Sequence, residues 1–426
     1  MEKVKSRDKL PLLILPVYYT IFFYSNSTDW INGDATQLSK ISTSSIRYSF
    51  QRYSQWSSRF WIEGATLFST RHVWLFGLLS LCAVVLLTYS LSSLLAYENF
   101  RMNLVLSILI IATFPISCLN SAGWIATTVN YIWPMSLFAY WLSITIKYKG
   151  TRAKAIYRVI ATLCLVLSIF SEILTLAAAG FLLLNALITK RKFLNWFNLI
   201  SSFITVMGII NVLFCPGNLK RKSIEIKHWF PQYSSFSPVD RLIIQLNHLG
   251  GFITGTYGVV LICTIVLLLV VSIINKKIVA SILLLLSISL QNICNNIMKL
   301  NMQKIAGEIM LKKFHKNDIS GLYLSSFLIL LSLILIALAV MVVYGKNATS
   351  LTMISSPTIF LLIALTSSDS PTLISSMDRP FIPFYLSLIV FSSLIVHALI
   401  ETSPKEKEII QTNAQLEYVV AGYCKA

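Results

Sequence analysis

The chain has 426 residues, of which 56% are hydrophobic and only 12% are charged, and its mean hydropathy is +0.72. A soluble globular domain carries about 25% charged residues, so this composition excludes one and indicates a polytopic membrane protein. The formal net charge is +18. Lys and Arg gather in cytoplasmic loops and at lipid headgroups, so we attribute this charge to the membrane and expect no nucleic-acid partner.

The apolar runs predict the fold class. No small-x-small cleavage site follows the first run, so we expect a retained first helix rather than a signal peptide. A spanning helix needs about 20 apolar residues. We therefore predict an all-α transmembrane bundle of about twelve spans, within a range of about 10 to 14. The runs begin at Leu10, Val73, Met102, Ile132, Ile156, Ile173, Leu194, Phe252, Ile278, Leu322, Leu351 and Phe381.

Residues 1–400 are expected to form one transmembrane domain in the cell membrane, and residues 401–426 a cytoplasmic tail. With twelve spans, the short basic segments fall on one side together with both termini, and the positive-inside rule makes that side the cytoplasm. The outer side then receives the long loops, of which the first is expected to carry interfacial helices. These loops are residues 25–72, 119–131, 215–250, 295–320 and 367–379.

The first outer loop contains two candidate general bases, Asp29 and Asp34. Carboxylates in a cleft at the membrane surface can accept a proton from a hydroxyl group. Asp34-Ala-Thr-Gln also resembles a helix N-cap followed by Gln three residues later, which is the alternative for that residue. Asp29 lacks this alternative and is the better catalytic candidate.

The segment Ile46–Phe68 carries aromatic residues at helical spacing, which predicts one helix in the membrane interface. Arg52 and Arg59 are seven residues apart, so they share a face that could hold a phosphate. A plain interfacial anchor helix is the alternative.

Three later segments carry further candidates. Residues 120–134 are rich in amide, hydroxyl and indole groups, which recognise sugars but also occur in ordinary turns. Lys220 and Arg221 follow a Pro-Gly-Asn turn, and either a donor phosphate or a lipid headgroup could be their partner. Arg379 lies at the end of the last outer loop and is a further candidate for binding the donor phosphate. Glu172 interrupts an apolar run and either has a function within the membrane or is simply exposed at a short turn. The candidate sugar- and acceptor-binding residues are Trp56, Glu63, Trp124, Asn130, Tyr131, Trp133 and Asn218.

The seven cysteines and five histidines contain no CxxC pair and no metal-ligand spacing. Cysteines in apolar runs behave as small hydrophobic residues. We therefore expect no disulfide framework, no metal site and no cofactor; a divalent metal beside the acids has no supporting motif.

An acid after the first run is followed in order by RYSQWSSRFWIEG, WIATTVNYIWP, CPGNLKR with EIKHWFP, and SP…DR. This order resembles a family of uncharacterised polytopic proteins from Gram-positive bacteria, chiefly streptococci and lactobacilli, which are similar to GT-C superfamily glycosyltransferases. The resemblance implies that Asp29 or Asp34 is the catalytic base, and that Arg59, Arg221 and Arg379 bind the donor phosphate. Relatives are expected to carry two adjacent acids, whereas here Trp30 follows Asp29.

The resulting hypothesis is a membrane glycosyltransferase that moves a sugar, with inversion, from undecaprenyl phosphate to a cell-wall or surface glycan outside the cell. Its expected partners are the polyprenyl-phosphate-linked sugar, the glycan acceptor and the bilayer, with a donor-synthesising glycosyltransferase and a small flippase as further candidates. The alternative is a lipid-linked oligosaccharide flippase or polymerase, or another polytopic transporter. Those proteins need charges along their spans, whereas here the charges concentrate in outer loops, which favours the transferase.

Overall fold

The computed structural model describes the backbone of residues 6–26, 28–95, 99–147, 155–255, 258–310, 316–345, 348–372, 376 and 378–401. This part of the chain is entirely helical apart from its connecting segments, and it contains no strand. The α-helices in chain order are α1 (Ile14–Ser25), α2 (Asp34–Leu38), α3 (Ser45–Gln55), α4 (Phe60–Arg71), α5 (Val73–Leu94), α6 (Phe100–Thr113), α7 (Trp124–Thr127), α8 (Trp133–Lys147), α9 (Ala155–Ser168), α10 (Glu172–Thr189), α11 (Trp196–Phe214), α12 (Pro216–Trp229), α13 (Pro238–Thr254), α14 (Val259–Ile274), α15 (Ile278–Met310), α16 (Ser320–Tyr344), α17 (Ala348–Thr366) and α18 (Ile382–Glu401).

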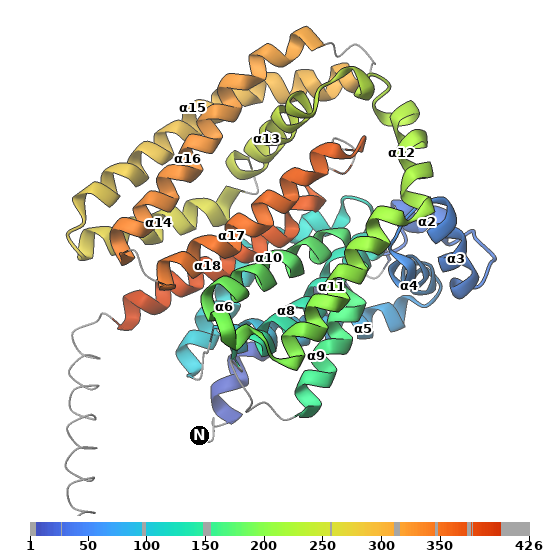
Figure 1. Cartoon of the computed structure of the whole chain (residues 1–426), viewed down its shortest axis with the longest axis horizontal. Helices are drawn as coiled ribbons and strands as arrows, with labels where there is room; N and C mark the ends of the chain where they lie inside the picture. Colours follow the sequence, from blue (N-terminus) through green and yellow to red (C-terminus); the bar gives the residue numbers. More distant parts are fainter. Residues whose placement is uncertain are drawn as a thin grey trace, which may run out of the picture.

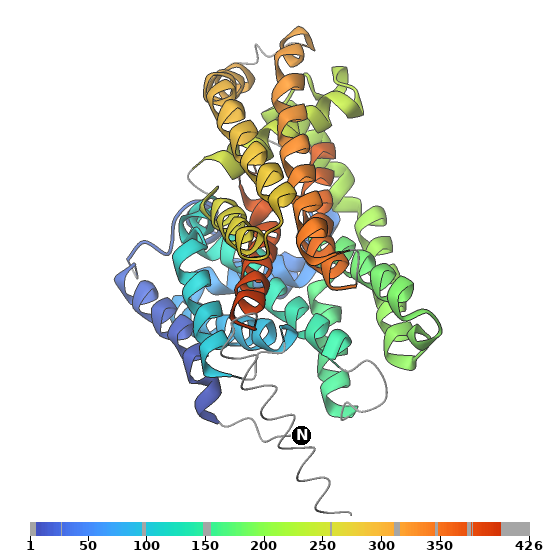
Figure 2. The same ribbon diagram turned by 90° about the vertical axis from the view of Figure 1, so that its left-hand side faces the viewer.

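The helices form two groups with α17 and α18 between them. Helices α1–α11 make the larger group, and α13–α16 extend from it as a second group (Figures 1 and 2). Most residues of α18 are buried, and α18 packs against α6, α14 and α17. The short helices α2–α4 lie together at one end of the larger group, and α12 connects that end to α13 (Figure 1).

The protein is membrane-associated. Within the described residues, six helices are long and apolar enough to cross a bilayer, or seven if α13 and α14 form one span. The six are α5, α10, α11, residues 278–297 of α15, α16, and a segment that contains α18. Each of the twelve predicted runs corresponds to a helix, but α1, α6, α8 and α9 have only 12 to 15 residues. The number of twelve spans therefore stays a prediction, as do the orientation and the cytoplasmic placement of the termini. The tail 402–426 lies outside the described residues.

Two expectations about the outer loops are wrong. The segment Ile46–Phe68 is two helices, α3 and α4, because the chain turns at residues 56–59, which we call the 56–59 linker. Residues 295–310 continue helix α15 instead of forming a loop. Residues 215–250 are also largely helical, since they contain α12 and most of α13.

Aromatic packing fixes the start of the first outer segment. Trp30 is almost completely buried, and its indole Nε1 donates a hydrogen bond to the carbonyl oxygen of Phe23 at 3.1 Å. Its ring stacks on Phe23 with a centroid distance of 4.8 Å. A buried indole of this kind usually satisfies its N–H in this way. The chain that leaves α1 is thereby turned back onto the bundle before α2 begins.

Candidate active site

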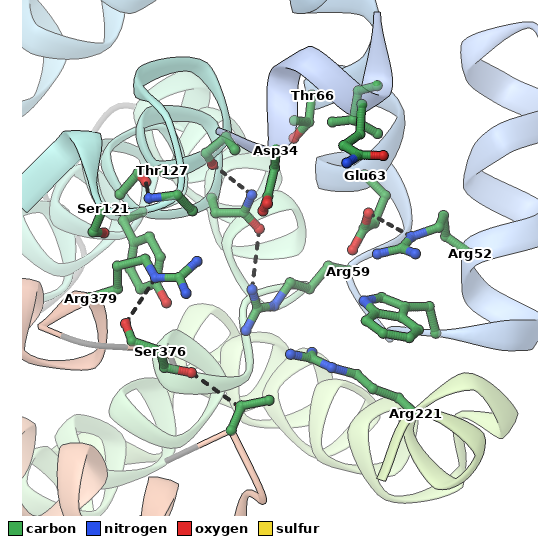
Figure 3. A pocket seen from close by; sticks show the side chains of 18 of the residues that line it. Asp34, Arg52, Arg59, Glu63, Thr66, Ser121, Thr127, Arg221, Ser376 and Arg379 are labelled. Carbon is green, nitrogen blue, oxygen red and sulfur yellow. Dashed lines mark hydrogen bonds and ion pairs between the residues drawn. The ribbon is translucent and has the colours of Figure 1, made fainter. Parts of the chain in front are cut away.

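A cavity of about 570 Å³ lies where α2, α3, α4 and α12 meet the segment 121–131 and residues Thr372, Ser376 and Arg379 (Figure 3). Four arginines and three acids line it, so the cavity is strongly charged. Nine of the fourteen predicted site residues contribute to its lining. These are Asp34, Arg52, Trp56, Arg59, Glu63, Asn130, Tyr131, Arg221 and Arg379.

The 56–59 linker is held in place by the junction of α11 and α12. The backbone N–H of Ser58 donates to Asn218 Oδ1 at 3.2 Å, and Asn211 Nδ2 donates to the Ser58 carbonyl at 3.3 Å. The amide of Asn218 also donates to the carbonyl of Val212 at 2.9 Å. Because both polar ends of the Asn218 side chain contact protein backbone, its predicted role in sugar binding is replaced by a structural one.

The Cys-Pro-Gly-Asn sequence has a packing explanation at the same junction. Cys215 Sγ lies 3.2 Å from the carbonyl oxygen of Tyr53, and Pro216 occupies the first turn of α12, where its missing N–H costs nothing. A Cβ atom on Gly217 would lie 2.5 Å from the backbone nitrogen of Trp56. Only glycine allows α12 to approach the linker this closely, so the motif positions the side chains that follow it on α12.

Arg59 is committed to contacts within the protein. Its NH2 group forms an ion pair with Glu172 Oε2 at 2.7 Å, and its NH1 group donates to Asn130 Oδ1 at 3.2 Å. Burial alone lowers the pKa of Arg59, but the ion pair with Glu172 outweighs burial and the pKa is raised, so this residue stays charged. Both terminal nitrogens are occupied, and the buried Nε has no partner among the described residues. Arg59 is therefore a poor bidentate ligand for a phosphate, contrary to expectation.

Arg52 and Arg221 are held in matching ways on Trp56. The Nε of Arg52 contacts Glu63 at 2.9 Å, and the Nε of Arg221 contacts Glu225 at 2.8 Å. Their guanidinium carbons lie 4.7 Å and 5.4 Å from the Trp56 ring centroid. Each guanidinium is thus held at its Nε edge by a carboxylate and on its flat face by the Trp56 ring. Their terminal nitrogens make no hydrogen bond with other described residues, and Figure 3 shows Arg221 extending toward Arg59 in the middle of the cavity.

Asp34 is brought to the cavity by the docking of two loops. Its backbone N–H donates to the carbonyl of Ala122 at 2.9 Å, and Asn32 Oδ1 accepts from the Trp124 N–H at 3.1 Å. The backbone at Gly33 has φ of +53°, a conformation that favours glycine. Asp34 is the first residue of α2, and Gly33 takes the N-cap position, so the predicted capping role is wrong. The Asp34 carboxylate makes no hydrogen bond within the described residues and lines the cavity.

The other four predicted site residues lie away from the cavity lining. Asp29 is exposed, and its carboxylate accepts a hydrogen bond from the Thr28 hydroxyl at 3.4 Å. Trp124 is 8% exposed and packs edge-on against Phe22 in the core. Trp133 donates from Nε1 to the hydroxyl of Ser80 at 2.9 Å. Lys220 is exposed on α12.

Thr372, Ser376 and Arg379 complete the cavity wall, and Asp369, which precedes them, is tied to α12. Asp369 accepts hydrogen bonds from Lys222 at 3.2 Å, from Arg241 at 2.8 Å and from the Tyr233 hydroxyl at 3.1 Å. Partial burial raises the pKa of Asp369, but the hydrogen bond from Lys222 and the other nearby positive groups outweigh it, and the pKa is lowered. This network joins α12, α13 and the segment that carries Arg379.

Several lining residues were missed by the sequence analysis, and they are mostly hydroxyl, amide and aromatic side chains. A usable signal existed only on α12, where Arg221, Glu225 and Trp229 repeat every four residues and so share one helix face. Treating residues 215–250 as a loop concealed this pattern. The missed residues with polar or aromatic side chains are Gln37, Tyr48, Thr66, Ser121, Thr127, Glu225, Trp229, Thr372 and Ser376, and the missed apolar ones are Leu38, Ile41, Ala122 and Ala126.

Within the described residues, no group of three or more His, Cys, Asp or Glu side chains is placed to hold a metal ion. No protein-family model, curated protein or solved structure matches the chain. The resemblance to GT-C glycosyltransferases therefore stays a prediction.

Proposed function

We propose that the protein is a membrane glycosyltransferase that transfers a sugar from a polyprenyl-phosphate donor to a cell-wall or surface glycan. The observation that carries this proposal is the arrangement of Arg52 and Arg221 on Trp56, in the same cavity as Asp34. A guanidinium with two unoccupied terminal nitrogens matches the oxygens of a phosphate. The cavity thus offers an oxyanion site and a carboxylate that makes no hydrogen bond within the described part of the chain.

The transfer step follows from these two groups. An acceptor hydroxyl oxygen attacks the anomeric carbon of the donor and forms the new glycosidic bond, while its proton passes to the Asp34 carboxylate. The bond between the anomeric carbon and the donor phosphate oxygen breaks, and the lipid phosphate leaves with the electron pair. Arg52 and Arg221 stabilise the negative charge that grows on that phosphate. Attack opposite the leaving group inverts the anomeric carbon.

The position of the cavity favours a transferase over a flippase. The four arginines that line it lie at or beyond the ends of the candidate spans, since α3, the 56–59 linker and α12 contain three of them and Arg379 begins the last span. A passage for a charged lipid headgroup needs polar groups along the membrane depth. We further propose that the cavity faces the outside of the cell, as the distribution of short basic loops indicates.

The proposal is tested with purified protein in lipid vesicles. A panel of radiolabelled polyprenyl-phosphate hexoses is supplied together with isolated wall glycans, and release of free polyprenyl phosphate is measured. Transfer by the wild-type protein and its loss in the Arg52→Gln, Arg221→Gln double variant are expected. Movement of the intact lipid-linked sugar across the vesicle membrane, without cleavage of the sugar–phosphate bond, would overturn the proposal.

A further inference from the structure

One face of α12 carries an anion-binding and an aromatic side chain at its two ends. Arg221, Glu225 and Trp229 all line the cavity and are spaced by four residues. With a rise of about 1.5 Å per residue, Arg221 and Trp229 are about 12 Å apart along the helix axis. This span is longer than a single pyranose ring, so a sugar bound against Trp229 lies beyond a sugar whose phosphate is held by Arg221 and belongs to a further unit of a longer chain.

The cavity that Trp229 lines also carries the apolar and amide groups of a carbohydrate site. Trp229 is 43% exposed, so a large part of its indole is open to a ligand. The same cavity is lined by the amide of Gln37 and by Leu38 and Ile41. Sugars present one apolar C–H face and a rim of hydroxyl groups, which an indole face and a side-chain amide match.

Two parts of the cavity wall are held in fixed positions. The guanidinium of Arg71 donates to the carbonyl of Thr43 at 2.7 Å and also to the carbonyl of Ile41, which fixes the chain after α2. On the other side, the buried carboxylate of Glu225 is held by Arg221. A site with fixed walls loses little conformational freedom when a ligand binds.

A membrane anchor is the alternative explanation for an exposed tryptophan. Trp229 shares the cavity face with Arg221 and Glu225, whereas Ile224, which is 52% exposed, lies about 100° around the helix from Glu225, the middle residue of that face. A tryptophan that only anchors the protein in lipid is not expected on the charged face of α12. The position of Trp229 therefore favours a polar ligand with an apolar face.

We infer that the part of the cavity lined by Trp229 binds an extended glycan of at least two sugar units, with Trp229 stacking on one of them. The inference rests on the proposed function in one respect, because that function makes this glycan the acceptor. Arg221 then holds the donor phosphate at one end of the same helix face, and the acceptor chain leaves past Trp229 at the other.

The test measures binding of the purified protein to arrayed glycans of one to four units, built from hexoses, N-acetylhexosamines or deoxyhexoses. The wild-type protein is expected to bind chains of two or more units at least about tenfold more tightly than the matching single sugar. Trp229→Ala is expected to remove that preference, and Trp229→Phe to keep most of it. Trp74→Ala is the matched control, since Trp74 is 66% exposed but lies outside the cavity lining.

Two results would overturn the inference: no preference of the wild-type protein for longer chains, or an unchanged preference in Trp229→Ala. A Trp229→Ala variant that binds glycans normally but partitions less into vesicles identifies Trp229 as a membrane anchor and also overturns it. The two proposals can fail separately. Length-dependent glycan binding without sugar transfer supports the glycan site and contradicts the transferase. Sugar transfer without length-dependent binding supports the transferase and contradicts the glycan site.

Discussion

Arg59 and Glu172 form an ion pair of 2.7 Å although 113 residues separate them in the sequence. Arg59 closes the 56–59 linker, and Glu172 begins α10 after the break that interrupts a long apolar run. Ser58 adds a hydrogen bond from its hydroxyl to the same carboxylate at 3.1 Å. The pair therefore fixes the linker, and with it Trp56, against the membrane-embedded part of the bundle.

Removing the carboxylate should destabilise the protein. Glu172→Gln leaves the Arg59 charge without its counter-ion, which costs about 3 kcal/mol, near the low end for a broken buried pair because the two side chains keep 20% and 26% exposure. Thermal unfolding in detergent measures the effect. The double variant Arg59→Gln, Glu172→Gln should recover most of the loss, and a double variant no more stable than Glu172→Gln would contradict this explanation.

Trp56 should control donor affinity through the two arginines that lie on it. Trp56→Ala removes two cation–π contacts worth about 0.5–1 kcal/mol each, so donor binding should weaken about tenfold. Trp56→Phe retains an aromatic face and should lose less. Titration with inorganic phosphate gives the affinities, and equal affinity in Trp56→Ala and the wild-type protein would show that the indole does not orient the arginines.

Gly217 should tolerate no side chain. Gly217→Ala places a Cβ atom 2.5 Å from the Trp56 nitrogen, so α12 has to shift away from the linker at a cost of about 1–3 kcal/mol. The control is Gly321→Ala on α16, because nothing lies within 4 Å of the added atom there. Thermal unfolding should show a lower midpoint for Gly217→Ala only; equal midpoints would contradict the close packing of α12.

Lowering the pH should weaken the contacts of Asp369, which join α12 and α13 to the segment that carries Arg379. The pKa of Asp369 is lowered in the folded protein, so its contribution to stability is present above the ordinary aspartate pKa of about 4 and is lost as the pH falls through the lower folded-state value. The side chain is 69% exposed, which limits the contribution to less than about 1 kcal/mol. Unfolding midpoints recorded between neutral and acidic pH should converge for Asp369→Asn and the wild-type protein. A constant difference across that range would contradict this role.

The sequence indicated the helical membrane fold and most of the charged cavity residues because both follow from local composition. Apolar runs predict helices, and charges clustered outside them predict a polar site. The sequence could not predict which side chains are occupied or buried by contacts with residues far away in the chain. Both terminal nitrogens of Arg59 are occupied by residues 71 and 113 positions away. Trp124 looked like a sugar-binding residue in a polar segment, yet Asn32 and Phe22 hold it in the core.

The choice between Asp29 and Asp34 shows the same limit. Both acids follow the first apolar run, and sequence spacing favoured Asp29 because Asp34 resembled a helix cap. The structure places Gly33 at the cap and docks the chain on Ala122, so Asp34 lines the cavity and Asp29 does not.

We propose that Asp34 is the general base for sugar transfer. A comparison of Asp34→Asn with Asp29→Asn tests this role most directly. Sugar transfer from the polyprenyl-phosphate donor is measured for Asp34→Asn and Asp29→Asn in the same vesicles, with unfolding midpoints to confirm that both variants fold. Asp34→Asn should lower the transfer rate at least about 100-fold while donor binding is retained, and Asp29→Asn should leave the rate unchanged. Normal transfer by Asp34→Asn, or a loss confined to Asp29→Asn, would contradict the account.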